Sequence, residues 1–195
     1  MTSRLARLTL AVAGIAAAAT CTQAQESYGE IALSDESVQL RYLRPETDAP
    51  VGNEAGELGF GLFLSEARDI VATGHYYFEA DRLRFNKLSF KVGPVAYAAM
   101  LNTENTDVFS VAIGAEIRLR FLERQELDIV GRAAYAPDVL TFGSADKLWD
   151  VTARVELPLT DRVVGFGGYR LFEVDLLGGT QELEESLIFG VRYRF

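Results

Sequence analysis

Hydrophobic side chains alternate with small or polar ones over much of this chain. The alternation is most regular in residues 108–121, where odd-numbered positions are apolar and even-numbered ones include Glu116, Arg118 and Arg120. Successive side chains of a β-strand point to opposite faces, so the pattern predicts a strand with one apolar face and one small or charged face. A helix would scatter those charges through its apolar stripe. Residues 108–121 are therefore predicted to form a long β-strand.

The same period of two recurs along the chain and predicts an all-β fold. The other alternating segments, the first three strong and the rest weaker, are residues 127–135, 148–157, 187–195, 38–44, 57–64, 70–78, 88–101, 163–174 and 28–33. A single bacterial chain forms a membrane barrel with an even number of strands, so we expect ten strands. Eight strands is the alternative, with the amino-terminal segments packed elsewhere.

Alternation alone fits both a soluble sandwich and a closed antiparallel transmembrane β-barrel. Segments such as 88–101 and 108–121 exceed the ~5–6 residues of most strands and suit the ~9–11 residues that a tilted strand needs to cross a bilayer. The chain also ends on an aromatic residue, which is common in outer-membrane barrels. Aromatic side chains near the ends of the apolar faces suggest an interfacial girdle; they are Phe109, Phe121, Tyr135, Trp149, Tyr169, Tyr193 and Phe195. These features favour the barrel.

The lengths of the connections predict the direction of the strands. With Phe195 at the periplasmic rim, the short segments 81–85, 123–125 and 159–161 become periplasmic turns. Residues 137–147 and 175–185 are longer and are expected to be external loops, together with the brief segments 65–69 and 102–107. Residues 44–56 then form a long periplasmic connection.

The first 24 residues resemble a cleaved secretory signal peptide. Arg4 and Arg7 precede an apolar run, residues 8–19, that is too short to span a bilayer. Small residues at Thr22 and Ala24 predict cleavage after Ala24, so we divide the chain into a leader, 1–24, and a barrel, 25–195. A core helix and lipidation of Cys21 are the alternatives, but the run has no polar face and residues 18–20 depart from a lipobox.

The amino-acid composition argues against several functional classes. The formal net charge of −9 argues against a nucleic-acid partner, because phosphates require an excess of Lys and Arg. One Cys and one His leave no basis for a disulfide framework or a thiolate metal site. No apolar stretch reaches the 18 residues typical of a transmembrane helix. We expect no catalytic, cofactor or metal site.

Several short motifs resemble those of the YfaZ family of putative outer-membrane proteins. They are the leader, the Gly-rich alternating strands, residues 135–138 after a strand, residues 168–170 near the end of the chain, and the final Tyr193-Arg194-Phe195. The resemblance covers most of the chain after the leader, and each motif is short. It implies a small β-barrel in the outer membrane. It implies no activity, because the family has no established one, and residues 83–85 and 181–185 depart from its pattern.

In a barrel of this size the inward faces would gather many charges. The residues expected there are Glu116, Arg118, Arg120, Asp128, Arg132, Asp150, Arg154, Glu156, Arg170, Arg192 and Arg194. Eight strands leave an interior just filled by side chains, and ten leave slightly more room. We expect a network of ion pairs that largely plugs the lumen, because unpaired buried ions are costly. The alternative is a narrow polar path in which arginines favour anions.

The single imidazole does not suggest catalysis. His75 shares a face with Val71, Thr73 and Tyr77, and we expect this face to line the lumen, out of reach of a lipid ester. The acidic residues Glu182, Glu184 and Glu185 suit a solvated loop better than a calcium site.

These observations predict an outer-membrane protein with a structural or narrow-channel, porin-like role and no enzymatic activity. One alternative is adhesion or interaction through the segments 137–147 and 175–185; a less favoured one is a lipid-modifying enzyme. The expected partners are outer-membrane lipids and the barrel-assembly machinery, which would engage the last strand ending at Phe195.

Overall fold

The computed structural model describes residues 26–46, 55–79, 87–102, 106–122, 127–143, 145–176 and 179–195. The expected leader, the turns 81–85 and 123–125, and the middle of the connection 44–56 lie outside the described residues.

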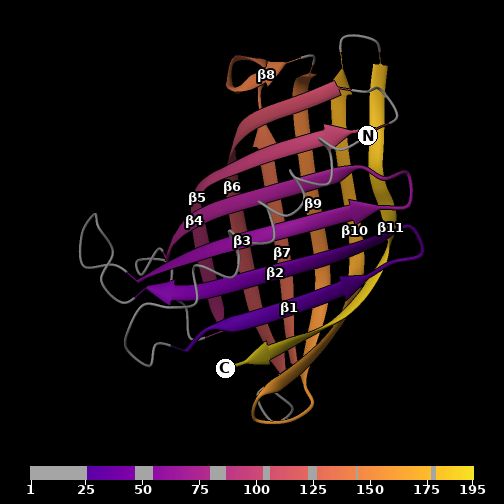
Figure 1. Cartoon of the computed structure of the whole chain (residues 1–195). Helices are drawn as coiled ribbons and strands as arrows, with labels where there is room; N and C mark the ends of the chain where they lie inside the picture. Colours follow the sequence, from indigo (N-terminus) through magenta and orange to yellow (C-terminus); the bar gives the residue numbers. More distant parts are fainter. Residues whose placement is uncertain are drawn as a thin grey trace.

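Ten antiparallel strands form a closed barrel (Figure 1). Their bounds are β1 Tyr28–Leu33, β2 Ser37–Glu46, β3 Gly56–Ser65, β4 Ile70–Glu79, β5 Leu88–Leu101, β6 Thr106–Leu122, β7 Leu127–Ala136, β9 Ala145–Pro158, β10 Val163–Leu176 and β11 Gly179–Arg194. Each pairs with the next in this order, and β1 pairs with β11 from Tyr28↔Arg194 to Leu33↔Phe189. The predicted closed ten-stranded antiparallel barrel is confirmed, and the eight-stranded alternative is wrong.

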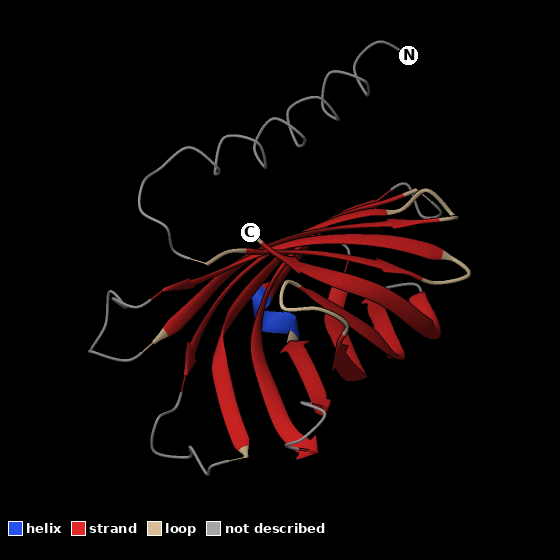
Figure 2. Ribbon diagram, turned by 90° about the horizontal axis from the view of Figure 1, so that it is seen from below, coloured by secondary structure: helices blue, strands red, loops and turns tan. Residues whose placement is uncertain are grey.

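The segment expected to be a loop at 137–147 is partly ordered into secondary structure. A 3-10 helix, η3 (Asp138–Leu140), leads into the short strand β8 (Thr141–Gly143), and β9 already begins at Ala145. β8 pairs with Val108–Ser110 of β6, which gives partners to backbone groups at the end of the barrel. Figure 2 shows η3 in blue among the strands. Within the described residues, no helix is long and apolar enough to cross a bilayer.

The second expected external loop, 175–185, is wrong for most of its length. β10 continues to Leu176 and β11 begins at Gly179, with Glu173 opposite Glu182 and Asp175 opposite Thr180. The backbone ladder continues here because its hydrogen bonds do not require apolar side chains. In β10 the polarity of the two faces is reversed here, with Val174 buried and Glu173 and Asp175 outside, and in β11 both faces carry polar residues.

The barrel wall has two contrasting faces. Its outer face carries exposed large apolar side chains from every strand except β4, among them Ile113 at 66% and Phe189 at 61% of full exposure. The even-numbered side chains along the middle of β6, including Ser110 and Glu116, are buried in the interior. We refer below to the end of the barrel where β1 begins and β11 finishes as the Phe195 end, and to the other as the opposite end.

Strands β9 and β10 approach so closely that one position excludes a side chain. A Cβ on Gly168 would collide with the carbonyl oxygen of Ala153 and lie 2.7 Å from Arg154 Cα, both backbone atoms. We expect Gly168→Ala to lower the free energy of unfolding by about 1–3 kcal/mol, because the two strands would have to separate. The measurement is urea unfolding of the refolded barrel in detergent micelles.

Gly131 on β7 is the matched control for this substitution, because a Cβ there would meet nothing within 4 Å. Gly131→Ala should leave the unfolding midpoint unchanged. Equal midpoints for the two variants would contradict the close approach of β9 and β10.

Candidate functional site in the barrel interior

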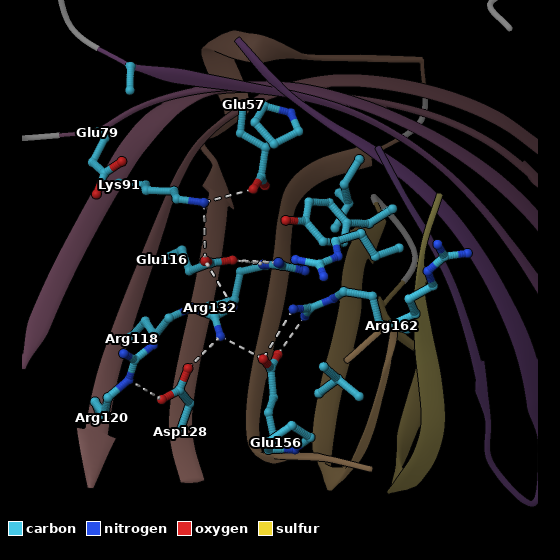
Figure 3. Close-up of a pocket in the computed structure, with 18 of the residues that line it drawn as sticks. Glu57, Glu79, Lys91, Glu116, Arg118, Arg120, Asp128, Arg132, Glu156 and Arg162 are labelled. Carbon is cyan, nitrogen blue, oxygen red and sulfur yellow. Dashed lines mark hydrogen bonds and ion pairs between the residues drawn. The ribbon is translucent and has the colours of Figure 1, made fainter. Parts of the chain in front are cut away.

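A cavity of about 750 Å³ occupies the Phe195 end of the barrel and is lined mainly by charged side chains. Strands β3, β5, β6, β7 and β9 direct these side chains inward, since each residue has the inward parity of its strand. Figure 3 shows Lys91, Glu116, Arg118 and Glu156 converging on the space between the strands. We call this cavity the charged chamber.

Buried ion pairs on one side of the chamber connect β1, β9 and β11. Arg154 donates two hydrogen bonds to the carboxylate of Glu30, Nη1 to Oε1 at 2.7 Å and Nη2 to Oε2 at 2.9 Å, and a third from Nε to Glu156 at 2.8 Å. Arg192 donates to the same two carboxylates, at 2.6 Å to Glu156 Oε1 and 3.2 Å to Glu30 Oε2. Two-pronged pairs of this kind are the strongest that a guanidinium makes.

The network continues around the barrel through β6 and β7. Arg118 bridges Glu156 and Asp128, with Nη1 at 2.6 Å and 3.1 Å from their oxygens. Arg132 donates from Nε and Nη2 to Glu116 Oε2.

Beyond Glu116 the network reaches strands β3 and β5. Lys91 Nζ lies 3.7 Å from Glu116 Oε1 and donates to Glu57 Oε2 at 2.7 Å (Figure 3). The ion pairs nearer the Phe195 end therefore form one connected network, which spans most of the circumference of the barrel. We call it the lower network.

A second ionic cluster, which we call the upper cluster, lies closer to the opposite end. Arg170 donates to both oxygens of Asp150 at 3.0 Å and to Glu184 Oε2 at 3.1 Å. Its guanidinium also lies over the rings of Phe63 and Phe172, 5.0 Å and 4.7 Å from their centroids. Contact with aromatic faces is favourable for a desolvated cation.

A cavity of about 30 Å³, the volume of one water molecule, lies between the two ionic clusters. Arg154, His75, Asp150 and Arg170 are among the residues that line it.

An apolar cluster fills the opposite end of the interior, and the sequence reasoning missed it. Phe63 packs edge-to-face against Phe172 at 5.7 Å between ring centroids. The other buried members include Val71, Tyr97, Leu101, Val108, Leu148, Val174 and Leu183. The available signal was the unbroken apolar run 94–101, in which both faces of the strand are apolar. Such a run indicates an apolar interior as well as an apolar exterior.

The eleven residues expected in the lumen fall into three places. Glu116, Arg118, Arg120, Asp128, Arg132, Arg154, Glu156 and Arg192 belong to the lower network, Asp150 and Arg170 to the upper cluster, and Arg194 to the mouth. Arg194 Nη2 donates to the backbone oxygen of Asp161 at 2.8 Å and lies apart from both networks.

Among the described residues, five Arg, Lys and Glu members of the two interior networks were not among the expected residues. They are Glu30, Arg41, Glu57, Lys91 and Glu184. The first four have inward parity on strands whose alternation is weak. Glu184 lies where the β10–β11 register shifts between Phe172 and Glu173, so that Leu183 and Glu184 are both buried.

The single histidine is enclosed by the barrel wall. The ring of His75 stacks beside Tyr77 at 4.5 Å, and its Nε2 lies 3.5 Å from Glu57 Oε1. Gly59 opposite leaves the space that the ring occupies, because a Cβ there would collide with it. The side chain is buried and does not reach the outer surface.

Most of the aromatic residues expected at the membrane interfaces lie on the outer face near the two ends of the barrel. Toward the opposite end are Phe109 and the stacked pair Tyr135 and Trp149, whose centroids are 4.3 Å apart, whereas Tyr169 lies midway along β10. Toward the Phe195 end are Phe121, Tyr193 and Phe195, the last two in edge-to-face contact at 5.2 Å.

No group of three or more His, Cys, Asp or Glu side chains in the described part of the chain is placed to hold a metal ion. No protein-family model matches the chain, and no curated protein matches it. Among solved structures, it is similar to the crystal structure of the outer membrane channel DcaP of Acinetobacter baumannii, with a TM-score of 0.45 and 8% sequence identity. The match covers 89% of this chain and 60% of that one, and a likeness so distant assigns no function.

Proposed function

We propose that this protein is an outer-membrane β-barrel with a structural role and a lumen closed to steady passage of solutes. The contrast between the two faces of the wall supports the membrane location. Exposed apolar side chains such as Ile113, Phe189 and Val155 cover the outside, whereas the ion pairs lie inside. An apolar exterior of this kind is compatible with contact to lipid chains. Closure of the barrel gives every strand a hydrogen-bonded neighbour on both sides, so no strand edge is exposed within the bilayer.

The observation that supports a closed lumen is the order in which charged and apolar layers follow one another along the interior of the barrel. Ion pairs around Arg154 and Glu156 span the lower part, Arg170 with its two carboxylates follows, and the apolar cluster around Phe63 and Phe172 occupies the opposite end. Dehydrated apolar packing opposes the passage of water and ions, and paired guanidinium groups hold the charged layer together.

A planar-bilayer recording tests this function directly. We expect the purified, refolded protein to insert without resolved current steps, because the apolar cluster holds no continuous polar path. Insertion is verified separately: unboiled and boiled samples should migrate differently on a denaturing gel, since a closed barrel resists detergent. Regular steps from verified wild-type protein would replace the closed barrel with the narrow-channel alternative, and an anion preference would implicate its arginines.

Several finer features belong to the same proposal. We also propose that the chain is related to the YfaZ family, which its motifs resemble, that the leader 1–24 is cleaved, and that β11 docks on the barrel-assembly machinery. The exposed aromatic side chains near the two ends of the barrel fit the two interfaces of the outer membrane.

The interaction alternative is favoured by one observation. The hairpin of β10 and β11 extends beyond the apolar part of the wall, where Glu173 and Glu182 lie opposite each other. An acidic hairpin reaching past the bilayer could contact a partner at the cell surface. Silent bilayers combined with loss of surface binding after shortening residues 173–185 would support this role.

The lipid-modifying alternative depends on His75. We expect His75→Ala to leave the lipid A of an expressing host unchanged relative to wild type, because the ring is enclosed between Tyr77 and Glu57. Mass spectrometry of lipid A from cells with the wild-type protein, the variant or no protein is the measurement. A modification present only with the wild-type protein would establish an enzyme.

A further inference from the structure

The charged chamber shows its solvent a cationic surface even though its walls carry charges of both signs. The carboxylates of the lower network are the more buried partners: side-chain exposure is 1% for Glu30, 2% for Glu116, 3% for Glu156, 11% for Asp128 and 13% for Glu57. The cations of the same network that line the chamber are more exposed: 11% for Arg192, 13% for Arg132, 18% for Lys91, 24% for Arg118 and 52% for Arg120. The acidic groups thus lie behind the basic ones.

The same network also contains more cations than anions. Among the described residues, seven Arg and Lys side chains share five carboxylates within ion-pair distance. The residues that line the chamber itself include seven Arg and Lys side chains and seven Asp and Glu side chains, so an anion is attracted by the greater exposure of the basic groups and not by their number.

Two arginines, Arg120 and Arg162, line this space near its mouth. Arg120 joins the network through Nε alone, 3.3 Å from Asp128 Oδ1, and Arg162 also lines the cavity (Figure 3). Three further carboxylates line the cavity from the strand ends, and of these Glu46 is paired with Arg44 at 3.2 Å. The other two are Glu79 and Asp161.

We propose that the charged chamber binds a small multivalent anion bearing phosphate groups, with Arg118, Arg120 and Arg162 as its principal contacts. Guanidinium groups match the geometry of phosphate oxygens, and several of them together favour a ligand with more than one negative charge. A volume of about 750 Å³ is that of a small-molecule site and exceeds one phosphate group. The mouth lies among strand ends, so the ligand enters from the aqueous phase at the Phe195 end.

Titration calorimetry of the folded protein in uncharged detergent, with inorganic pyrophosphate as the probe at low ionic strength, tests this site. Wild type should show saturable binding that weakens as salt is added. Arg120→Gln combined with Arg162→Gln should weaken it by roughly a hundredfold, about tenfold for each lost charge-assisted hydrogen bond. Arg120→Lys should retain part of the affinity, because the charge remains while the planar fork is lost.

Lys147→Gln is the matched control, because this exposed residue lies on β9 at the opposite end of the barrel. It removes the same charge from the protein and should bind pyrophosphate as wild type does. Absence of saturable binding by wild type would overturn the proposal, and so would equal affinities for the control and the Arg120/Arg162 variant. All variants are first checked for the folded-barrel gel shift.

A second arm separates a soluble ligand from a lipid headgroup. The titration is repeated in nanodiscs of phosphatidylcholine and in nanodiscs rich in phosphatidylglycerol. Similar pyrophosphate affinities indicate a soluble ligand, whereas loss of binding only in the anionic nanodiscs assigns the chamber to a lipid phosphate. The inference deepens the proposed closed barrel, but its outcome is independent: conductance reports on the apolar cluster, and the titration reports on the chamber.

Discussion

Replacing Arg154 with leucine is expected to lower the free energy of unfolding by about 3–5 kcal/mol. Arg154 is 3% exposed and is shared by Glu30 and Glu156, which are equally inaccessible to water. Its removal takes away the two-pronged partner of the buried Glu30 carboxylate and leaves it the longer contacts with Arg192, at 3.2 Å, and Arg41, at 3.7 Å. Urea unfolding of the refolded protein, followed by tryptophan fluorescence and by the gel shift, is the measurement.

Arg194→Leu is the control for this prediction. The side chain is 40% exposed and contacts the Asp161 carbonyl and, at 3.7 Å, Glu26, so its loss should cost about 0–1 kcal/mol. Adding Glu30→Gln to Arg154→Leu should recover part of the lost stability, because one stranded charge is removed. If Arg154→Leu unfolds at the wild-type urea concentration, the buried network does not stabilise the fold.

Truncating the two phenylalanines at the centre of the apolar cluster should convert a silent barrel into a conducting one. Phe63 and Phe172 are fully buried and meet edge-to-face, with Arg170 between their faces and the polar interior. In Phe63→Ala/Phe172→Ala, water can enter the vacated space and join the polar groups around Arg170 to the opposite end. Planar-bilayer recordings should then show current steps that the wild type lacks.

The outer aromatic pair Phe109 and Phe142 supplies the control, since their rings lie 6.1 Å apart on the exposed face. Replacing both with alanine removes the same atoms and should leave the bilayer silent. Each buried Phe→Ala change costs about 3–5 kcal/mol, so Phe63→Ala alone is recorded as well in case the double variant does not refold. Silence from folded Phe63→Ala and from the folded double variant would show that the apolar cluster is not the barrier.

Sequence patterns predicted the strands well wherever one face was apolar and the other was not. In β6, Ile113 and Ile117 lie outside and Glu116 lies inside, as alternation predicts. The prediction was wrong for residues 175–185, which continue β10 and β11. There the polarity of the faces is reversed in β10, where Glu173 and Asp175 lie outside and Val174 is buried. In β11 a register shift interrupts the alternation, although the backbone pairing continues.

The apolar cluster was harder to predict for a different reason. Val95, Tyr97, Ala99 and Leu101 are inward residues of β5, but their outward neighbours are apolar as well. A strand that is apolar on both faces carries no signal of which side faces the interior. The assumption that every inward face is charged therefore failed at one end of the barrel.

The sequence by itself determined the period-two pattern, the approximate extent of most strands and the two faces of the wall, because side-chain alternation is a local property of extended backbone. Only the tertiary structure decided which charges meet. Arg154 and Glu30 are 124 positions apart, and they pair because β1 closes the barrel against β11 and the stagger of the strands brings β9 level with β1 across the interior. Closure and register are properties of all ten strands together, and they place the ion pairs at one end and the apolar cluster at the other.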